Sequence, residues 1–167
     1  MSHEDLIESE IDCHVVTVSS SRDGDTDRSG KLIRDLLEAD GHKILSSKVI
    51  PDSPDEIEEQ IESAVTSGSR VLVLTGGTGL SSRDQTVDVL RRLEDKELPG
   101  FGELFRSLSY EDIGARAALS RARASLIGNT LVFSLPGSPA AVELGMEKLI
   151  LPSIGHAVYE IDKEGSR

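Results

Sequence analysis

The chain has 167 residues, 37% of them hydrophobic and 3% aromatic, and a formal net charge of -12 from 30 Asp and Glu against 18 Lys and Arg. This length and apolar content fit one domain of ordinary size. We expect no nucleic-acid partner, because the acidic surface repels phosphate backbones and few rings are present to stack on bases. The acidity fits either solvated helix faces or a halophilic, high-salt cytoplasm in which screening removes self-repulsion.

Cysteine and histidine usage indicates neither a disulfide framework nor a metal cluster. Cys13 is the only cysteine, and the four histidines are scattered without metal-ligand spacing. Residues 1–12 are acidic, unlike a signal peptide, and no apolar run approaches membrane length. We therefore expect a cytoplasmic protein without a membrane partner, frayed over residues 1–11 and folded as one domain over residues 12–163.

Strand and helix patterns alternate through the first part of the chain. In order, they predict a strand at 14–20, a polar loop at 21–30, a helix ending at Gly41, a strand at 43–50, a helix from Pro54, a strand from Val71 and a helix over 86–95. Ser53, Pro54 and Glu56 match an N-cap, a proline at the first helical position and a capping box.

The remaining part adds an antiparallel element. Its predicted elements are a loop and short helix at 99–109, strands at 123–127 and 130–135, and a helix from Pro139 to about Leu149. Gly128 and Asn129 give a two-residue hairpin signal between the strands, and Ser138 is a suitable N-cap. For the apolar residues of 99–109 we expect one of three roles: packing on the core, forming a lid or contacting another subunit. We predict an α/β fold with three layers: a doubly wound, mostly parallel sheet with an antiparallel edge hairpin.

Residues 71–86, VLVLTGGTGLSSRDQT, place a strand, a glycine cluster, an aspartate and a helix start in immediate succession. The apolar run is typical of a strand buried on both faces of a parallel sheet. The glycines allow sharp turns and close backbone approach to a ligand. Thr86 is a suitable N-cap whose helix points its free N–H groups at the same space, and Asp84 can cap that helix or hold a cation. This layout predicts a phosphate-binding site.

Two better-known phosphate loops do not match. No lysine occurs between Lys48 and Lys96, so the GxxxxGK[ST] loop is excluded. Gly77, Gly79 and Ser82 give GxGxxS, one residue short of a dinucleotide fingerprint, and no strand ending in an acid follows about 20 residues later. The alternative to a ligand site is an ordinary strand-to-helix glycine turn.

The strand-glycine-helix arrangement occurs again at 134–141, where Pro136, Gly137 and Ser138 precede a helix. Gly137 permits close backbone approach or a turn with positive φ. Two helix N-termini at neighbouring strand ends would give two anion sites in one crevice. Asp52 follows the second strand on the same sheet edge, so it either shares a magnesium ion with Asp84 or is a turn aspartate before a capped helix.

Four segments together resemble one known family. They are TGGTGLSSRDQT at 75–86, GFGELFR at 100–106, LSRA at 119–122 and LPGSP at 135–139. In this order they are similar to the molybdopterin-binding family that includes MoaB and MogA, over roughly residues 13–155. The resemblance implies a doubly wound α/β domain that forms trimers or hexamers. In the active branch, it implies adenylylation of molybdopterin by magnesium ATP with release of pyrophosphate, which primes the pterin for molybdate or tungstate insertion.

The resemblance also implies roles for particular residues. It makes Gly76, Gly77, Thr78 and Gly79 the phosphate loop. Asp84 falls on the essential acidic position and Asp52 on the second acid of the active branch, so both are expected to be catalytic and to hold Mg²⁺. The other residues expected to bind molybdopterin or ATP are Ser19, Ser20, Ser82, Arg83, Thr86, Pro136, Gly137 and Ser138. For Ser19 and Ser20 this expectation comes from their place after the first strand, and a polar strand end is an equally good account of them.

Positive charge for the phosphates could come from Arg83, Arg22 or Arg28, or these could be solvated surface residues. One MoaB-type branch lacks the second acid, so Asp52 favours an enzyme. GFGELFR and residues 110–114 are nevertheless more similar to MoaB than to MogA. A noncatalytic molybdopterin carrier or scaffold is therefore the second hypothesis, and a generic nucleotide-binding α/β protein is the third. The expected partners are molybdopterin, ATP, further copies of the chain and a downstream metal insertase.

Overall fold

The computed structural model of the chain describes residues 10–164. Most of the segment expected to be frayed, residues 1–9, lies outside the described residues. Ile11 corrects the end of that segment, because its side chain is 2% exposed and packs in the core. Its backbone oxygen also accepts a hydrogen bond from the Lys43 N–H at 2.9 Å. Ordered packing therefore includes Ile11.

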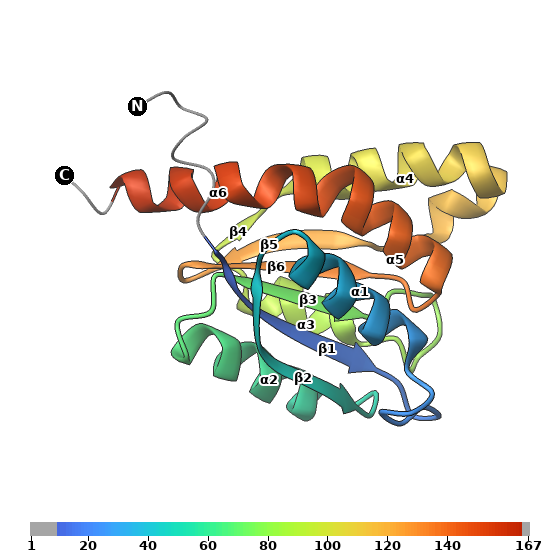
Figure 1. The fold of residues 1–167 in the computed structure, drawn as a ribbon. Helices are drawn as coiled ribbons and strands as arrows, with labels where there is room; N and C mark the ends of the chain where they lie inside the picture. Colours follow the sequence, from blue (N-terminus) through green and yellow to red (C-terminus); the bar gives the residue numbers. More distant parts are fainter. Residues whose placement is uncertain (1–9, 165–167) are drawn as a thin grey trace.

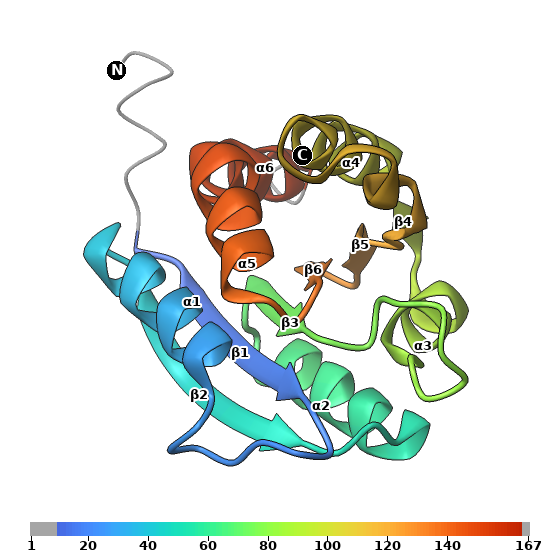
Figure 2. The same cartoon turned by 90° about the vertical axis from the view of Figure 1, so that its right-hand side faces the viewer.

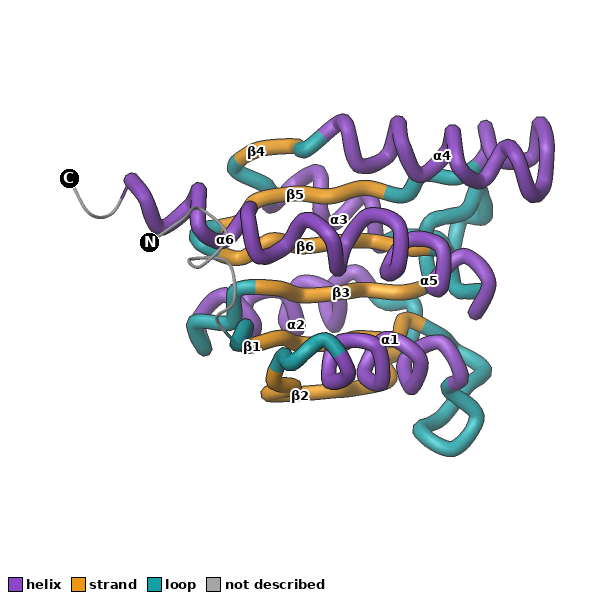
Figure 3. The backbone as a smooth tube through the Cα atoms, turned by 45° about the horizontal axis from the view of Figure 1, so that its top comes forward, coloured by secondary structure: helices purple, strands orange, loops and turns teal. Residues whose placement is uncertain are grey.

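Six strands form one sheet in the order β2-β1-β3-β6-β5-β4 (Figure 1). They are β1 Asp12–Val18, β2 Lys43–Ile50, β3 Val71–Thr75, β4 Lys96–Glu97, β5 Arg123–Ile127 and β6 Thr130–Leu135. β2, β1, β3 and β6 are parallel, whereas β5 runs antiparallel to both β6 and β4. The tube in Figure 3 shows these strands side by side. This confirms the expected doubly wound, mostly parallel sheet with an antiparallel edge hairpin.

Helices cover both faces of the sheet, which gives the three layers expected (Figure 2). They are α1 Arg28–Ala39, α2 Pro54–Thr66, α3 Thr86–Leu93, α4 Pro99–Ile113, the 3-10 helix η2 Gly114–Leu119, α5 Pro139–Gly145, the π-helical turn η3 Met146–Ile150 and α6 Leu151–Glu164. α1, α4, α5 and α6 cover one face, and α2 and α3 cover the other. Within residues 10–164, none of these helices combines the length and apolarity needed to cross a bilayer.

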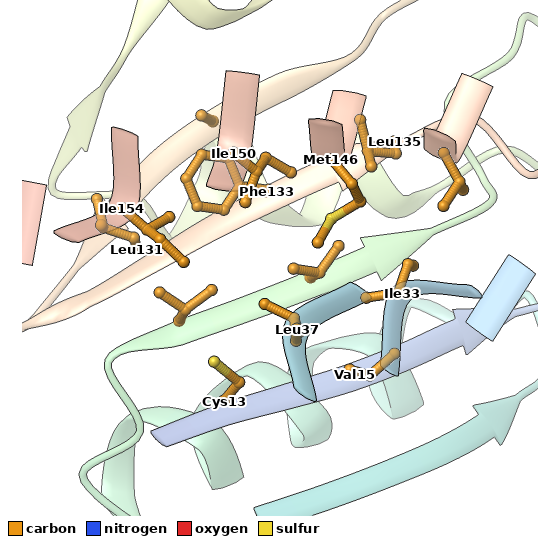
Figure 4. Packing of buried hydrophobic residues seen from close by; sticks show 14 of the residues in the cluster. Cys13, Val15, Ile33, Leu37, Leu131, Phe133, Leu135, Met146, Ile150 and Ile154 are labelled. Atoms are coloured by element: carbon orange, nitrogen blue, oxygen red, sulfur yellow. The ribbon is translucent and has the colours of Figure 1, made fainter. Parts of the chain in front are cut away.

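The apolar run of β3 is divided between two cores because side chains alternate along a strand. Val71 and Val73 belong to the core under α1, α5 and α6, which also holds Leu37 (Figure 4). Leu72 and Leu74 belong to the core on the other face, with residues of α2 and α3. All of β3 is buried. β3 therefore lies in the middle of the sheet, and its carboxyl end is held rigidly.

Several local expectations were wrong. Ser53 occupies the N-cap of α2, but its side chain makes no capping hydrogen bond, so no capping box forms. The helix expected to stop near Leu149 continues to Glu164 through the π-helical turn. Pro152 is tolerated because it lies in the first turn of α6, directly after the irregular π-helical turn, where a missing backbone N–H costs little. Ile154 continues the buried stripe of this helix. The helix expected within 99–109 runs to Ile113, and β4 was not anticipated because it has two residues.

Candidate functional site

A cleft of about 550 Å³ opens at the carboxyl edge of the parallel strands. β1 and β3 are neighbours, yet the chain leaves β1 for α1 on one face and β3 for α3 on the other. Such a switch point is where open α/β sheets bind ligands. Residues at the ends of four strands line the cleft. They are the last residue of β1 and the three that follow it (18–21), residue 52 after β2, residues 76–79, 83 and 84 after β3, and residues 136–137 after β6.

The glycine turn after β3 has a backbone that other residues would not fit. Gly76 and Gly77 have φ angles of 99° and 75°. A Cβ at Gly76 would lie 2.3 Å from the Val18 oxygen, and one at Gly77 would lie 2.1 Å from the Thr86 hydroxyl. Glycine is therefore required at both positions for conformation and for space.

The same turn leaves backbone donors at the cleft. The Gly76 N–H is occupied, because it donates to the Leu135 oxygen at 2.9 Å. The N–H groups of Gly77, Thr78 and Gly79 have no acceptor among residues 10–164. All three residues line the cleft, and consecutive backbone N–H groups without a protein acceptor are well suited to an anion such as phosphate.

Three predicted site residues do not line the cleft. Thr86 is fully buried, and its hydroxyl donates to the Gly76 oxygen at 2.9 Å, so it holds the glycine turn. It is the first residue of α3, whereas Gln85 takes the N-cap position. Ser82 is exposed beside the cleft, and its backbone oxygen accepts from the Gln85 amide. Ser138 caps α5 as expected, with its hydroxyl accepting from the Ala141 N–H at 3.2 Å.

The two aspartates reach the same cleft from β2 and β3. Asp84 Oδ2 accepts from the Ser81 N–H at 2.9 Å, and Asp52 Oδ2 accepts from the Ser20 hydroxyl at 2.8 Å. In the described part of the chain, Oδ1 of each carboxylate has no hydrogen-bond donor. No group of three or more His, Cys, Asp and Glu side chains that could hold a metal occurs there either. Carboxylates at one cleft are groups that could hold a cation such as Mg²⁺, which usually takes one or two protein carboxylates and keeps its other ligands.

The second glycine segment lies directly against the first. A Cβ at Gly137 would be 3.6 Å from the Gly76 Cα, and the Thr75 hydroxyl donates to the Pro136 oxygen at 2.9 Å. The Gly137 oxygen accepts from the Ser29 hydroxyl at 2.7 Å. Gly137 has no positive φ, so the expectation of a left-handed turn there was wrong. Its contribution is close backbone approach between the two segments.

Sequence reasoning gave no role to Arg121, which holds the outer side of the loop formed by residues 78–84. Its guanidinium donates to the Gly79 oxygen at 3.1 Å and to the Asp84 oxygen at 2.9 Å, and its N–H donates to the Thr78 oxygen at 3.2 Å. It also forms an ion pair with Asp88, which holds the pKa of that carboxyl below its usual range. Arg121 lies in the LSRA segment, but no local pattern shows that it reaches back to this loop.

The three arginines considered for positive charge have different positions. Arg83 lines the cleft and is exposed. Arg22 donates to the Gly137 oxygen at 3.4 Å from just outside the cleft. Arg28 begins α1, is exposed and does not line the cleft.

Comparison with known proteins agrees with this geometry. A family model described as "Probable molybdopterin binding domain" matches residues 14–156, and the chain belongs to this family. It is 44% identical over 164 residues to molybdenum cofactor biosynthesis protein B of Bacillus cereus, covering 97% of each sequence.

Solved structures of related proteins share the fold. A crystal structure of a molybdenum cofactor biosynthesis protein B superposes with a TM-score of 0.90 and 44% identity, over 93% of this chain and 98% of that one. The tungsten cofactor synthesizing protein MoaB from Pyrococcus furiosus has a TM-score of 0.79 and 37% identity, over 95% of this chain and 99% of that one. The resemblance seen in the motifs is thereby confirmed at the level of family and fold.

Proposed function

We propose that this protein acts in molybdenum or tungsten cofactor biosynthesis by binding molybdopterin and adenylylating its terminal phosphate with magnesium ATP. The observation that carries the proposal is that Asp52 and Asp84 line one cleft together with the free N–H groups of Gly77, Thr78 and Gly79. Donors for phosphate and ligands for a cation are thus combined at the switch point of a molybdopterin-binding domain.

In the proposed reaction, an oxygen of the pterin phosphate bonds to the α-phosphorus of ATP. The bond from that phosphorus to the oxygen bridging to the β-phosphate breaks, and pyrophosphate leaves with the bonding electrons. Bound Mg²⁺ would neutralise the charge that builds up on the phosphate oxygens. The protein's part is to position the groups, because this chemistry requires orientation and charge stabilisation more than covalent catalysis.

The residues of the cleft divide this work. The loop N–H groups of Gly77, Thr78 and Gly79 hold phosphate oxygens, and the free carboxylate oxygens of Asp52 and Asp84 hold the cation. The Ser20 hydroxyl fixes the orientation of Asp52 through its hydrogen bond. Ser19, Arg83, Pro136 and Gly137 complete the walls that contact pterin and nucleotide.

The proposal includes two further partners. Several copies of the chain would assemble into an oligomer, and a downstream metal insertase would take up the adenylylated product. Large apolar side chains are exposed in and beside α4, namely Leu98, Leu104, Tyr110, Ile113 and Leu119. Tyr110 and Leu104 are 63% and 57% exposed. A monomer gains nothing from such exposure, whereas a subunit contact would bury it.

A direct assay tests the proposed activity. Purified protein is mixed with molybdopterin, MgCl₂ and ATP, and both pyrophosphate and adenylylated pterin are quantified. The proposal predicts that the two products form in equal amounts and only when all three components are present. Tight molybdopterin binding without either product would instead indicate a noncatalytic carrier, and an absence of pterin binding would leave only a general nucleotide-binding protein.

A further inference from the structure

Two of the four motif segments have no residue in the cleft that Asp52 and Asp84 line. They are GFGELFR at 100–106, which belongs to α4, and LSRA at 119–122, which leads from η2 into β5. Both segments line a separate cleft of about 300 Å³. Their residues in its wall are Gly102, Arg106, Ser120, Arg121 and Ala122. The structure therefore brings the two motifs together at one place outside the proposed site.

Arg106 connects α4 to segment 120–122. Its Nη1 donates to the backbone oxygens of Ser120 at 3.4 Å and of Ala122 at 3.2 Å. Among residues 10–164, no carboxylate lies within 4.0 Å of this guanidinium. A charged donor makes stronger hydrogen bonds than a neutral one, and no ion pair competes for it here. Arg106 thus holds two backbone oxygens of the segment against α4.

Gly102 makes room for this contact. It lies one helical turn before Arg106 and is buried. A Cβ at Gly102 would lie 2.8 Å from the Ala122 oxygen and 2.9 Å from both Nη atoms of Arg106. Side chains of a helix lean toward its N-terminus, so the guanidinium packs over the backbone of the preceding turn. Any larger residue at position 102 would displace the guanidinium or the segment that it holds.

The segment held by Arg106 is also the one that holds the loop carrying Asp84. The Arg121 N–H donates to the Thr78 oxygen at 3.2 Å, and its guanidinium donates to the oxygens of Gly79 and Asp84 at 3.1 and 2.9 Å. Arg121 lies between the two residues whose oxygens accept from Arg106. A shift of this segment would therefore move all three contacts to the loop together.

We infer that Arg106 is a positioning residue: it fixes segment 120–122 and, through Arg121, the loop that carries Asp84. The chemical consequence rests on the proposed adenylyl transfer, in which Asp84 holds the cation and the loop N–H groups hold phosphate. Small displacements of such groups lower the rate, because the reaction depends on orientation. Arg106 does not line the site itself and acts only through the segment and the loop.

Amide hydrogen exchange measures the order of loop 78–84 without requiring catalytic activity. The Ser81 N–H donates to the Asp84 carboxylate at 2.9 Å, and the Asp84 N–H donates to the Ser81 oxygen at 3.0 Å, so both amides report opening of the loop. Loop peptides of Arg106→Gln should exchange about 3- to 10-fold faster than those of wild type, the effect of losing one or two hydrogen bonds. Exchange over α2, on the other face of the sheet, should be unchanged.

Two further variants make this test specific. Arg116→Gln removes an exposed arginine of η2 that lines neither cleft, so it controls for the loss of one positive charge and should exchange as wild type does. Gly102→Ala keeps every polar group and introduces a better helix former, yet its methyl group would crowd the Ala122 oxygen. It should therefore loosen the same loop, even if Arg106→Gln folds poorly.

Combination with Arg121→Gln separates positioning from a general structural role. If Arg106 acts through Arg121, adding Arg106→Gln to Arg121→Gln should speed loop exchange by less than about twofold, because the connection is already lost. The inference is overturned if the two effects multiply, or if the loop of a folded Arg106→Gln protein exchanges as in wild type.

The magnesium requirement of catalysis supplies the second readout. The magnesium concentration for half-maximal rate should rise in Arg106→Gln, as expected for a misplaced Asp84, and should be unchanged in Arg116→Gln. Faster loop exchange with an unchanged magnesium requirement would show that Arg106 does not position the cation ligand, and would overturn the inference. A loop that depends on Arg106 in a protein without adenylylation activity would contradict the proposed function but retain the positioning of the loop.

Discussion

The guanidinium of Arg121 donates a hydrogen bond to the backbone oxygen of Asp84 at 2.9 Å. A second hydrogen bond from the same group reaches the Gly79 oxygen, so one side chain holds both ends of segment 79–84. Asp84 lies at one end of this segment, and Gly79 lies against its carboxylate. The position of the proposed metal ligand therefore depends on a residue that does not itself line the cleft.

Arg121→Gln should lower turnover about 10- to 100-fold and raise the magnesium concentration needed for half-maximal rate. The reason is that the loop carrying Asp84 loses two hydrogen bonds that position it. Asp88→Asn is the matched control, because it weakens the ion pair but leaves both bonds to the loop. Arg121→Lys should restore little, since an ammonium group cannot reproduce the guanidinium fork. Equal magnesium requirements in Arg121→Gln and wild type would show that Arg121 acts on stability alone.

Asp52 and Ser20 should behave as a pair. Asp52→Asn is expected to reduce adenylylation strongly but less than a change at Asp84, because Asp52 is the second carboxylate. Ser20→Ala removes the hydrogen bond that orients Asp52 and should cost less, about tenfold. Steady-state rates of both single variants and the double variant test the coupling. If the two effects simply multiplied, the Ser20 hydroxyl would have a role independent of Asp52.

The largely buried pair of Glu94 and Arg123, whose side chains are 12% and 16% exposed, should determine part of the stability at acid pH. The Arg123 hydrogen bond holds the pKa of Glu94 below its usual 4.5. A carboxyl with a lowered folded pKa stabilises the fold above the unfolded value and loses that contribution as pH falls through the folded value. At pH 7, Glu94→Gln should reduce the free energy of unfolding by about 1.5 to 3 kcal/mol, and the difference should shrink from about pH 5 downward.

Urea unfolding at several pH values measures this difference. Glu58→Gln is the control, because Glu58 pairs with Arg92, whose side chain is 55% exposed, and such pairs contribute about 0 to 1 kcal/mol. A Glu94→Gln protein as stable as wild type at pH 7 would contradict the assignment.

Substitutions at two neighbouring residues after β6 should affect different properties, one the stability of the fold and the other the affinity for ligand. Ser138→Ala removes the cap of α5 and should cost about 0.5 to 2 kcal/mol of stability while ligand affinity stays normal. Gly137→Val should fold nearly normally, because its φ is not positive, but weaken molybdopterin binding about tenfold as its side chain fills the approach to Gly76. Unfolding midpoints and pterin affinities of both variants provide the test. Unchanged affinity in Gly137→Val would leave this segment a structural turn.

The fold was predictable because hydrophobic periodicity and turn-forming residues act over short stretches of sequence. Alternation of strands and helices gave the doubly wound sheet, and the common direction of parallel strands placed Asp52 and Asp84 at one edge before any contact was known. Gly76 and Gly77 were predictable because only glycine suits a sharp turn with close neighbours. These features depend on a few adjacent residues.

What could not be predicted depends on partners far apart in the chain. Thr86 matches an N-cap pattern, yet its hydroxyl is used by the Gly76 oxygen, a tertiary contact that local propensity does not contain. Arg121 reaches a loop 37 residues earlier, and its sequence neighbourhood is that of an ordinary surface arginine. β4 has two residues, and it forms only by pairing with the edge of β5.

The most direct test of the account measures molybdopterin affinity and adenylylation side by side in wild type and Asp84→Asn. Because Asp84 is assigned to the cation and the loop N–H groups to phosphate, the variant should bind molybdopterin within about threefold of wild type. Its formation of adenylylated pterin should fall at least about 100-fold with magnesium ATP. Wild-type turnover in Asp84→Asn would contradict the proposed site.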